Sequence, residues 1–239
     1  MVALVVQSLA AYFGEFLRKR RAATAESGDF STTLPAALTL LGLIIGFSFS
    51  MAVSRYDQRK DYEEAEANAI GTAYVRADLL PAAGAARVHE LLVRYTDQRI
   101  LFYRARDQEQ LRRVDMATAP SQDSLWSAVV ESTAAQRDPV SALVVAGMND
   151  VLNSQGYTQA AWWNRIPLGA WVLMWLVAIA CNLLVGYSEK RTSGMTLLVL
   201  PSIVAVALFL ISDIDSPRHG IIRVAPQNLV ALIQSFKSH

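Results

Sequence analysis

The sequence predicts an all-α integral membrane protein with an all-helical polar domain inserted between its membrane helices. Three uncharged segments reach the length of about 20 apolar residues that a membrane helix needs. A long polar stretch separates the first of these segments from the second. Neither an alternating strand pattern nor a hairpin signal of any weight accompanies them, so we expect no β-sheet.

Residues 1–33 are predicted to form a short N-terminal membrane or interfacial helix followed by a basic loop. The opening "MVALVVQSLAAYFGEFL" is apolar until Glu15, and the basic run Arg18–Arg21 follows it. A signal peptide has a similar length, but its basic residues precede the apolar stretch. We therefore predict a fourth, short membrane helix or one that lies in the interface.

Residues 34–54 are the first predicted span, and their helix continues beyond the membrane to about residue 80. The run "GFSFSMAVSRYDQRK" passes from apolar to charged residues without Gly or Pro to stop it after Gly46. No Pro occurs between Ala36 and Leu80, so one helix can have an apolar half in lipid and a polar half outside.

Residues 55–165 form the predicted helical domain outside the membrane. After the long helix, apolar residues at helical spacing predict a helix at Ala85–Arg106. Ser121 is a candidate N-cap for a second helix. Asp138 and Pro139 are a good N-cap and first-turn pair for a third.

Residues 166–213 are the predicted second membrane helix pair, and residues 214–239 are a tail that packs on the helical domain. The spans are Ile166–Tyr187 and Gly194–Ser212, the second with Pro201 inside it. Neighbouring membrane helices can satisfy the carbonyl that a central Pro frees. A soluble protein with three buried core helices is the alternative, but uncharged runs of this length are rare in soluble folds.

Composition and motifs exclude several function classes. The net charge of +1 provides no basic field for nucleic acid. A single cysteine, Cys181, excludes an internal disulfide and a cysteine-based zinc site. The three histidines are scattered, and phosphate-loop, GxSxG and EF-hand motifs are absent from the sequence. We therefore expect neither an enzyme nor a bound metal or cofactor.

Two faces of the span 34–54 are candidate functional surfaces. An apolar face at helical spacing is a candidate pore neck that gates by dewetting, and it comprises Leu40, Ile44, Phe47 and Met51. A stripe of small residues recurs every four positions and comprises Gly42, Gly46, Ser50 and Ser54. Such a stripe allows close approach of another helix, within one subunit or between subunits.

Polar residues near the membrane form a third candidate group. Four of them follow the first span along its helix: Glu66, Asn68, Thr72 and Arg76. Three follow the last span: Asp213, Asp215 and Arg218. They are interpreted as a buried polar network or as a wet vestibule, and Asp213 is a candidate partner for Arg218 or for a cation.

The stretch from Leu41 to Pro81 resembles the bestrophin-like membrane family. The matching motifs are "GFSFSMAVSRYDQRKDYEEAEANAIGTAYVRADLLP", and later "LW" at Leu125–Trp126, "NRIP" at Asn164–Pro167 and "DIDSPRHGIIRV" at Asp213–Val224. A more distant likeness is to the bestrophins, which are pentameric anion channels. Their pore helix has a Gly-Phe pair that is similar to Gly46–Phe47 here.

This resemblance implies a homo-oligomeric channel for small ions, which is a pentamer by analogy. It also implies that the conducted ions are anions and that Phe47 is a neck residue. The sequence departs from bestrophins at Ser48–Phe49–Ser50, where they have Arg-Thr-Asn. The alternative is a non-conducting membrane scaffold or sensor whose helical domain binds a partner. A transporter is disfavoured because the chain has no obvious inverted repeat.

The predicted location is a bacterial inner membrane, with lipid, small ions and other copies of the chain as partners. Bestrophin-like connectivity implies a cytoplasmic helical domain. The positive-inside rule points the other way, because Arg18–Arg21 and the short loop with Lys190 and Arg191 share the opposite side. Short loops count more in this rule, so the sequence slightly favours an extracytoplasmic domain.

Overall fold

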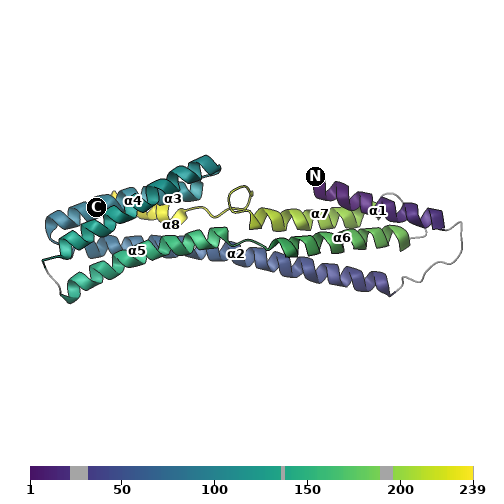
Figure 1. Cartoon of the computed structure of the whole chain (residues 1–239), viewed down its shortest axis with the longest axis horizontal. Helices are drawn as coiled ribbons and strands as arrows, with labels where there is room; N and C mark the ends of the chain where they lie inside the picture. Colours follow the sequence, from purple (N-terminus) through teal and green to yellow (C-terminus); the bar gives the residue numbers. More distant parts are fainter. Residues whose placement is uncertain (22–31, 136–137, 189–195, 239) are drawn as a thin grey trace. The chain divides into compact units, whose positions relative to one another are not determined.

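The computed structural model describes residues 1–21, 32–135, 138–188 and 196–238, and these residues form eight α-helices and no strand (Figure 1). The predicted all-α fold is therefore confirmed. The helices are α1 (Val2–Arg21), α2 (Thr33–Ala77), α3 (Ala82–Arg104), α4 (Gln108–Thr133), α5 (Pro139–Trp163), α6 (Leu168–Ser188), α7 (Thr196–Asp215) and α8 (Gln227–Phe236).

The chain divides into two compact units. The membrane unit comprises Met1–Ser54 and Arg165–Ser216, and the helical domain comprises Arg55–Asn164 and Pro217–His239. Among the described residues, three helical stretches are long and apolar enough to cross a membrane: Thr33–Ala77, Pro139–Ser188 and Leu197–Asp215. They contain the three predicted spans except for residues 194–196 of the last one, of which 194 and 195 lie outside the described ranges.

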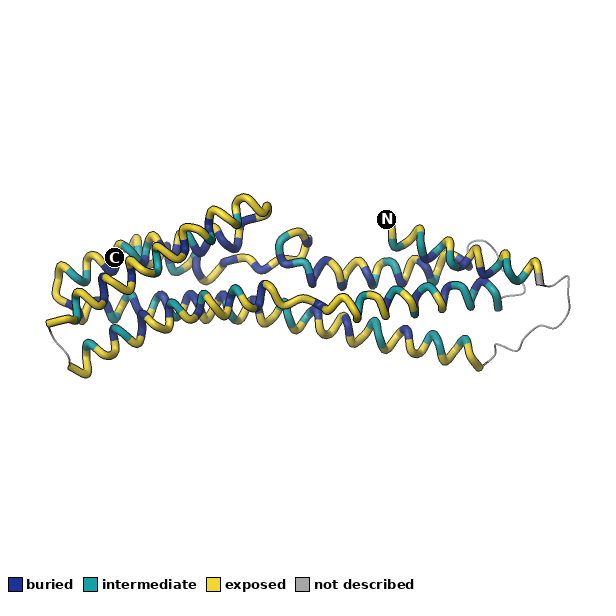
Figure 2. Tube along the Cα trace, viewed as in Figure 1, coloured by how far each residue is buried: buried dark blue, intermediate teal, exposed yellow. Residues whose placement is uncertain are grey.

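Helix α2 is one unbroken helix of 45 residues. It begins in the apolar segment and continues through Arg55, Asp57 and Lys60, as the absence of Pro predicted. The exposed side chains of its two halves differ in type, because lipid favours apolar side chains on an exposed face and water favours charged ones. Figure 2 shows buried and exposed residues alternating along the helix.

Helices α1 and α6 cross at two glycines. A Cβ at Gly14 would fall well inside van der Waals distance of the Leu183 backbone oxygen, and it would lie 3.0 Å from the Tyr187 nitrogen. A Cβ at Gly186 would overlap the Ala11 backbone oxygen in the same way. The two backbones therefore approach directly at both points, which is possible because the glycine at each point has no side chain.

A buried amide pair joins the same two helices. Asn182 Nδ2 donates to Gln7 Oε1 at 2.8 Å and to the Ala178 carbonyl at 2.9 Å. Both side chains are fully buried. A polar contact inside an apolar helix bundle fixes the relative register of the two helices, because slippage would leave amide groups without partners.

Helix α4 is longer than the sequence predicted, and the expected cap at Ser121 is wrong. The helix runs through Pro120, and its N-cap is Asp107, whose carboxylate accepts the Gln110 N–H at 2.7 Å. Ser121 lies inside the helix, and its hydroxyl donates to the Ala117 carbonyl at 2.8 Å. Proline removes one backbone hydrogen bond. Packing against α3 maintains the helix despite this loss.

Helix α5 begins where the sequence predicted. The Asp138 carboxylate accepts the Ser141 N–H at 2.7 Å and its hydroxyl at 2.8 Å, and Pro139 occupies the first turn. These hydrogen bonds to the ionised form, the backbone one foremost, hold the pKa of Asp138 below its ordinary value.

The C-terminal helix α8 packs on the core of the helical domain. Leu229 and Ile233 are buried, and Leu232 and Phe236 pack against the core cluster. The Phe236 ring stacks on Tyr74 of α2 with the centroids 3.9 Å apart. These apolar residues of α8 therefore contact this core, as expected for a tail that packs on the helical domain.

A carboxylate of α2 caps the first turn of α8. Glu63 accepts the backbone N–H of Leu229 at 3.0 Å and the side-chain amide of Asn228 at 2.6 Å. Pro226 precedes the helix and provides no side-chain cap of its own. A negative charge at a helix N-terminus is favourable because the free N–H groups and the helix dipole point towards it.

We expect Glu63→Ala to loosen α8 selectively. Loss of a cap costs about 0.5–2 kcal/mol. Hydrogen exchange should accelerate in α8 by about 2-fold to 30-fold, while exchange in α3 stays unchanged. Glu64→Ala is the matched control, because Glu64 is the neighbouring exposed carboxylate on α2. Equal exchange in both variants would contradict the capping role.

Candidate functional site

The predicted neck face of α2 is exposed in the single chain. Phe47 is 69% exposed, Leu40 is 50% exposed and Met51 is 42% exposed, whereas Ile44 is only partly exposed. A ring as exposed as that of Phe47 contacts lipid, another subunit or a pore. Within the described part of the membrane unit, Phe47, Leu40 and Met51 stay exposed.

The small-residue stripe is also bare within one chain. A Cβ built at Gly42 or Gly46 meets no described atom within 4 Å. Ser50 and Ser54 are exposed as well. Of the two interpretations made from the sequence, packing within one subunit is therefore not seen among the described residues.

The face that carries the small-residue stripe continues into the polar half of α2 at the same helical spacing. Asp57, Asp61, Glu64, Asn68 and Thr72 are exposed there. Spacings of three or four residues keep these positions on one side of a helix. Asn68 and Thr72, two of the predicted polar candidates, thus belong to a solvent-facing surface.

Glu66 instead belongs to a buried polar network in the helical domain. Its carboxylate pairs with Arg99 of α3, and both side chains are fully buried. Tyr103 and Thr158 each donate a hydroxyl hydrogen bond to Glu66 Oε2 at 3.1 Å. The network ties α2 to α3 and α5. For Glu66, the buried-network interpretation describes the observed contacts.

The sequence interpretation missed Arg99, Tyr103 and Thr158. The signal for Arg99 was its position, four residues after Tyr95 and three before Phe102, on the apolar face of the predicted helix. A cation on such a face needs a buried carboxylate. No comparable signal identified Thr158, since its partner lies on a helix far away in sequence.

Charge and burial shift the pKa values of the two groups beside Glu66, Arg99 and Tyr103. Burial, and then the charge of Glu66, raise the pKa of Tyr103 far above its ordinary value. Burial alone would lower the pKa of Arg99, but the adjacent Glu66 carboxylate outweighs it and the net pKa is raised. Both groups therefore keep one protonation state across the physiological range, as in a structural network rather than a proton-transfer site.

Arg76 packs between α2 and α5. Its guanidinium donates to the Leu143 carbonyl at 3.3 Å and lies 3.0 Å from the position of a Cβ on Gly147. A side chain at Gly147 would displace this arginine. Arg76 is therefore a helix-packing residue of the helical domain.

Asp215 and Arg218 make their contacts in different units, and each joins separate segments of its own unit. In the membrane unit, the Asp215 carboxylate accepts the Ile166 N–H at 3.0 Å and so joins the end of α7 to the start of α6. In the helical domain, Arg218 donates to the Phe102 carbonyl at 3.0 Å and stacks on the rings of Phe102 and Trp162. Asp213 is buried at the end of α7.

The geometry of the described residues also bears on metal binding and on thiol reactivity. Within the described ranges, no group of three or more His, Cys, Asp or Glu side chains is placed to hold a metal ion. Cys181 is buried, and its thiol donates to the Ala37 carbonyl at 3.3 Å. The chemical features that remain are an exposed apolar face, a bare small-residue stripe and an acidic continuation on α2.

Comparison with known proteins identifies relatives of the chain. The family model described as "Bestrophin-like domain" matches residues 1–229. No curated protein sequence matches the chain.

Solved structures share its fold. A crystal structure of a bacterial bestrophin homologue from Klebsiella pneumoniae, a point variant, superposes with a TM-score of 0.74 at 12% identity, covering 99% of this chain and 96% of that chain. Another structure of the Klebsiella pneumoniae homologue gives 0.73 at 13% identity, covering 99% and 95%. A variant described only as a membrane protein gives 0.76 at 11% identity, covering 99% and 97%.

Proposed function

Because the chain belongs to the bestrophin-like family, we propose that it forms a homo-oligomeric membrane ion channel with a hydrophobic neck on α2. The observation that carries the proposal is the bare face of the membrane half of this helix. Gly46 has open space where a Cβ would lie, and the adjacent Phe47 is the most exposed large apolar side chain of α2.

Neighbouring positions on a helix point about 100° apart, so Gly46 and Phe47 can perform different tasks in a ring of subunits. The stripe of Gly42 and Gly46 can receive the α2 helix of the next subunit. Phe47 and Leu40 then turn towards the axis, where apolar rings can exclude water until the neck widens. Closed cyclic symmetry repeats the same contact in every subunit. A pentamer is the number that the family resemblance implies.

Two ion classes compete within this proposal. The resemblance implies anions. The exposed carboxylates Asp57, Asp61 and Glu64 favour cations instead, if their face continues along the conduction path, because rings of acidic side chains attract cations. The reversal potential in a potassium chloride gradient distinguishes the two, and neutralising Asp61 should move it towards the chloride potential if cations are conducted.

We expect Phe47→Ala to raise single-channel conductance severalfold in reconstituted bilayers, since a shorter apolar neck is easier to wet. Phe49→Ala is the matched control. Phe49 is also exposed, but it lies about 200° from Phe47 around the helix and should leave conductance unchanged.

Two results would contradict the channel. One is a detergent-solubilised mass that fits a single chain. The other is the absence of ion current in both the wild type and Phe47→Ala. Either result would favour the second candidate, a non-conducting scaffold or sensor. Equal conductance increases in Phe47→Ala and Phe49→Ala would place the neck elsewhere.

We also propose an inner-membrane location with the helical domain on the extracytoplasmic side. The charge distribution of the sequence supports this proposal, because Arg18–Arg21 and the short loop with Lys190 and Arg191 lie on the opposite side of the spans and favour the cytoplasm. Gln108→Cys should react with an impermeant thiol reagent in intact cells. Wild type is the control, since its Cys181 is buried. Labelling only after lysis would place the domain in the cytoplasm.

A further inference from the structure

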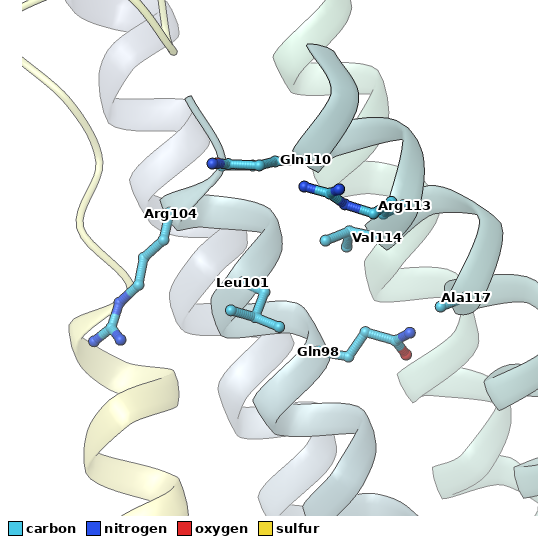
Figure 3. A pocket seen from close by; sticks show the side chains of 8 residues that line it. Gln98, Leu101, Arg104, Gln110, Arg113, Val114 and Ala117 are labelled. Atoms are coloured by element: carbon cyan, nitrogen blue, oxygen red, sulfur yellow. The ribbon is translucent and has the colours of Figure 1, made fainter. Parts of the chain in front are cut away.

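The hairpin of α3 and α4 contains a cavity that neither the pore nor the Glu66 network uses. It has a volume of about 350 Å³, within the range of small-molecule sites. Figure 3 shows Leu101 of α3 and Val114 of α4 pointing towards one another across it. The lining residues are Gln98, Leu101, Arg104, Ala105, Gln110, Arg113, Val114 and Ala117.

The cavity has an apolar floor between two polar ends. Leu101, Ala105, Val114 and Ala117 supply the floor. The lining positions of α4 extend from Gln110 to Ala117, about 10 Å at 1.5 Å per residue, so the floor can accept a single ring or a short chain. Leu101, which is part of this floor, is 55% exposed, so a ligand can cover apolar area there.

One polar end has a hydrogen-bond acceptor without a donor. The Oε1 atom of Gln98 is buried, and it has no hydrogen-bond partner among the described residues. Figure 3 shows this side chain extending from α3 towards Ala117 of α4. A buried acceptor without a partner is costly, and a ligand hydroxyl would relieve that cost.

The other polar end has donors. Arg113 lies 3.9 Å from Glu109, whose carboxylate is already bound at 3.0 Å by Arg112. Gln110 also lines this end, and its Oε1 accepts the Arg106 N–H at 3.2 Å. Arg104 lines the cavity, but its guanidinium points away from Gln110 and Arg113 (Figure 3). A carboxylate therefore complements the Arg113 end.

We propose that this cavity binds a small carboxylic acid with an apolar body and a hydroxyl at its far end. The carboxylate pairs with Arg113, the body covers Leu101 and Val114, and the hydroxyl donates to Gln98 Oε1. The site lies within the helical domain alone. The proposal is independent of ion conduction.

The test is calorimetric titration of the full chain in detergent with 4-hydroxyphenylacetate, against the same detergent without protein. Its methyl ester and phenylacetate test the two polar ends separately. We expect saturable binding of the acid, about tenfold weaker binding of the ester because the charge is lost, and an intermediate affinity for phenylacetate.

Variants assign each end. Arg113→Met should reduce the affinity for the acid to that for the ester, and Gln98→Leu should abolish the preference for the hydroxyl compound over phenylacetate. Arg112→Met is the matched control, because both arginine side chains are 66% exposed and only Arg113 lines the cavity. Ala117→Trp, at an exposed position, should fill the site and abolish binding while the circular dichroism spectrum is retained.

Three results would overturn the proposal. The first is no saturable heat with the wild type at millimolar acid. The second is equal loss of affinity in Arg112→Met and Arg113→Met. The third is wild-type affinity in Ala117→Trp.

Discussion

Glu66→Ala is expected to destabilise the helical domain by about 3–5 kcal/mol, because it leaves the guanidinium of Arg99 buried without its carboxylate. Both side chains are fully buried, so water cannot replace the lost partner. Tyr103 and Thr158 lose an acceptor in the same step. The denaturant midpoint of the purified chain in mild detergent, followed by circular dichroism, measures the change.

Two controls separate the ion pair from general damage to α2. Glu64→Ala removes an exposed carboxylate two residues away and should change stability by less than about 0.5 kcal/mol. The double variant Glu66→Met with Arg99→Met removes both charges and should recover much of the loss, since an apolar pair can replace a buried ion pair. Similar midpoints for Glu66→Ala and Glu64→Ala would show that the pair contributes little.

Gly186→Ala is expected to destabilise the membrane unit by about 1–3 kcal/mol, because the added methyl group meets the backbone of α1. A backbone oxygen cannot rotate away as a flexible side chain can, so the two helices must separate. Thermal unfolding in detergent should report a lower midpoint.

Gly169→Ala is the matched control on the same helix, since a Cβ there meets nothing within 4 Å. Alanine has the higher helix propensity, so this variant should be neutral or slightly stabilising. A lower unfolding midpoint for Gly186→Ala and an unchanged or higher one for Gly169→Ala would identify the contact with the α1 backbone as the cause. A neutral Gly186→Ala would mean that α1 and α6 adjust at no cost.

The helix-by-helix prediction was most accurate where one local rule decided the outcome. The uncharged runs matched the membrane-length helices, and the absence of Pro predicted that α2 continues past Lys60. Asp138 and Pro139 marked the start of α5. At Ser121 two local rules competed, and the cap signal was wrong because α4 passes through Pro120.

The candidate residues on α2 show what a single sequence leaves undecided. Periodicity placed Phe47 and Gly46 on defined faces, but it could not say which faces the rest of the chain covers. The described helices leave both exposed, and they bury Glu66 against Arg99. The sequence had grouped Glu66 with Asn68 and Thr72, which the structure exposes to solvent.

The sequence by itself determined the helical class, the spans and the long polar insert, because apolar runs and helical spacing are local properties of the chain. Tertiary structure alone decided the partners. Glu66 and Thr158, Glu63 and Leu229, and Gly14 and Leu183 meet only when distant helices pack. Their spacing along the chain carries no signal of contact, because packing geometry, not periodicity, brings these atoms together.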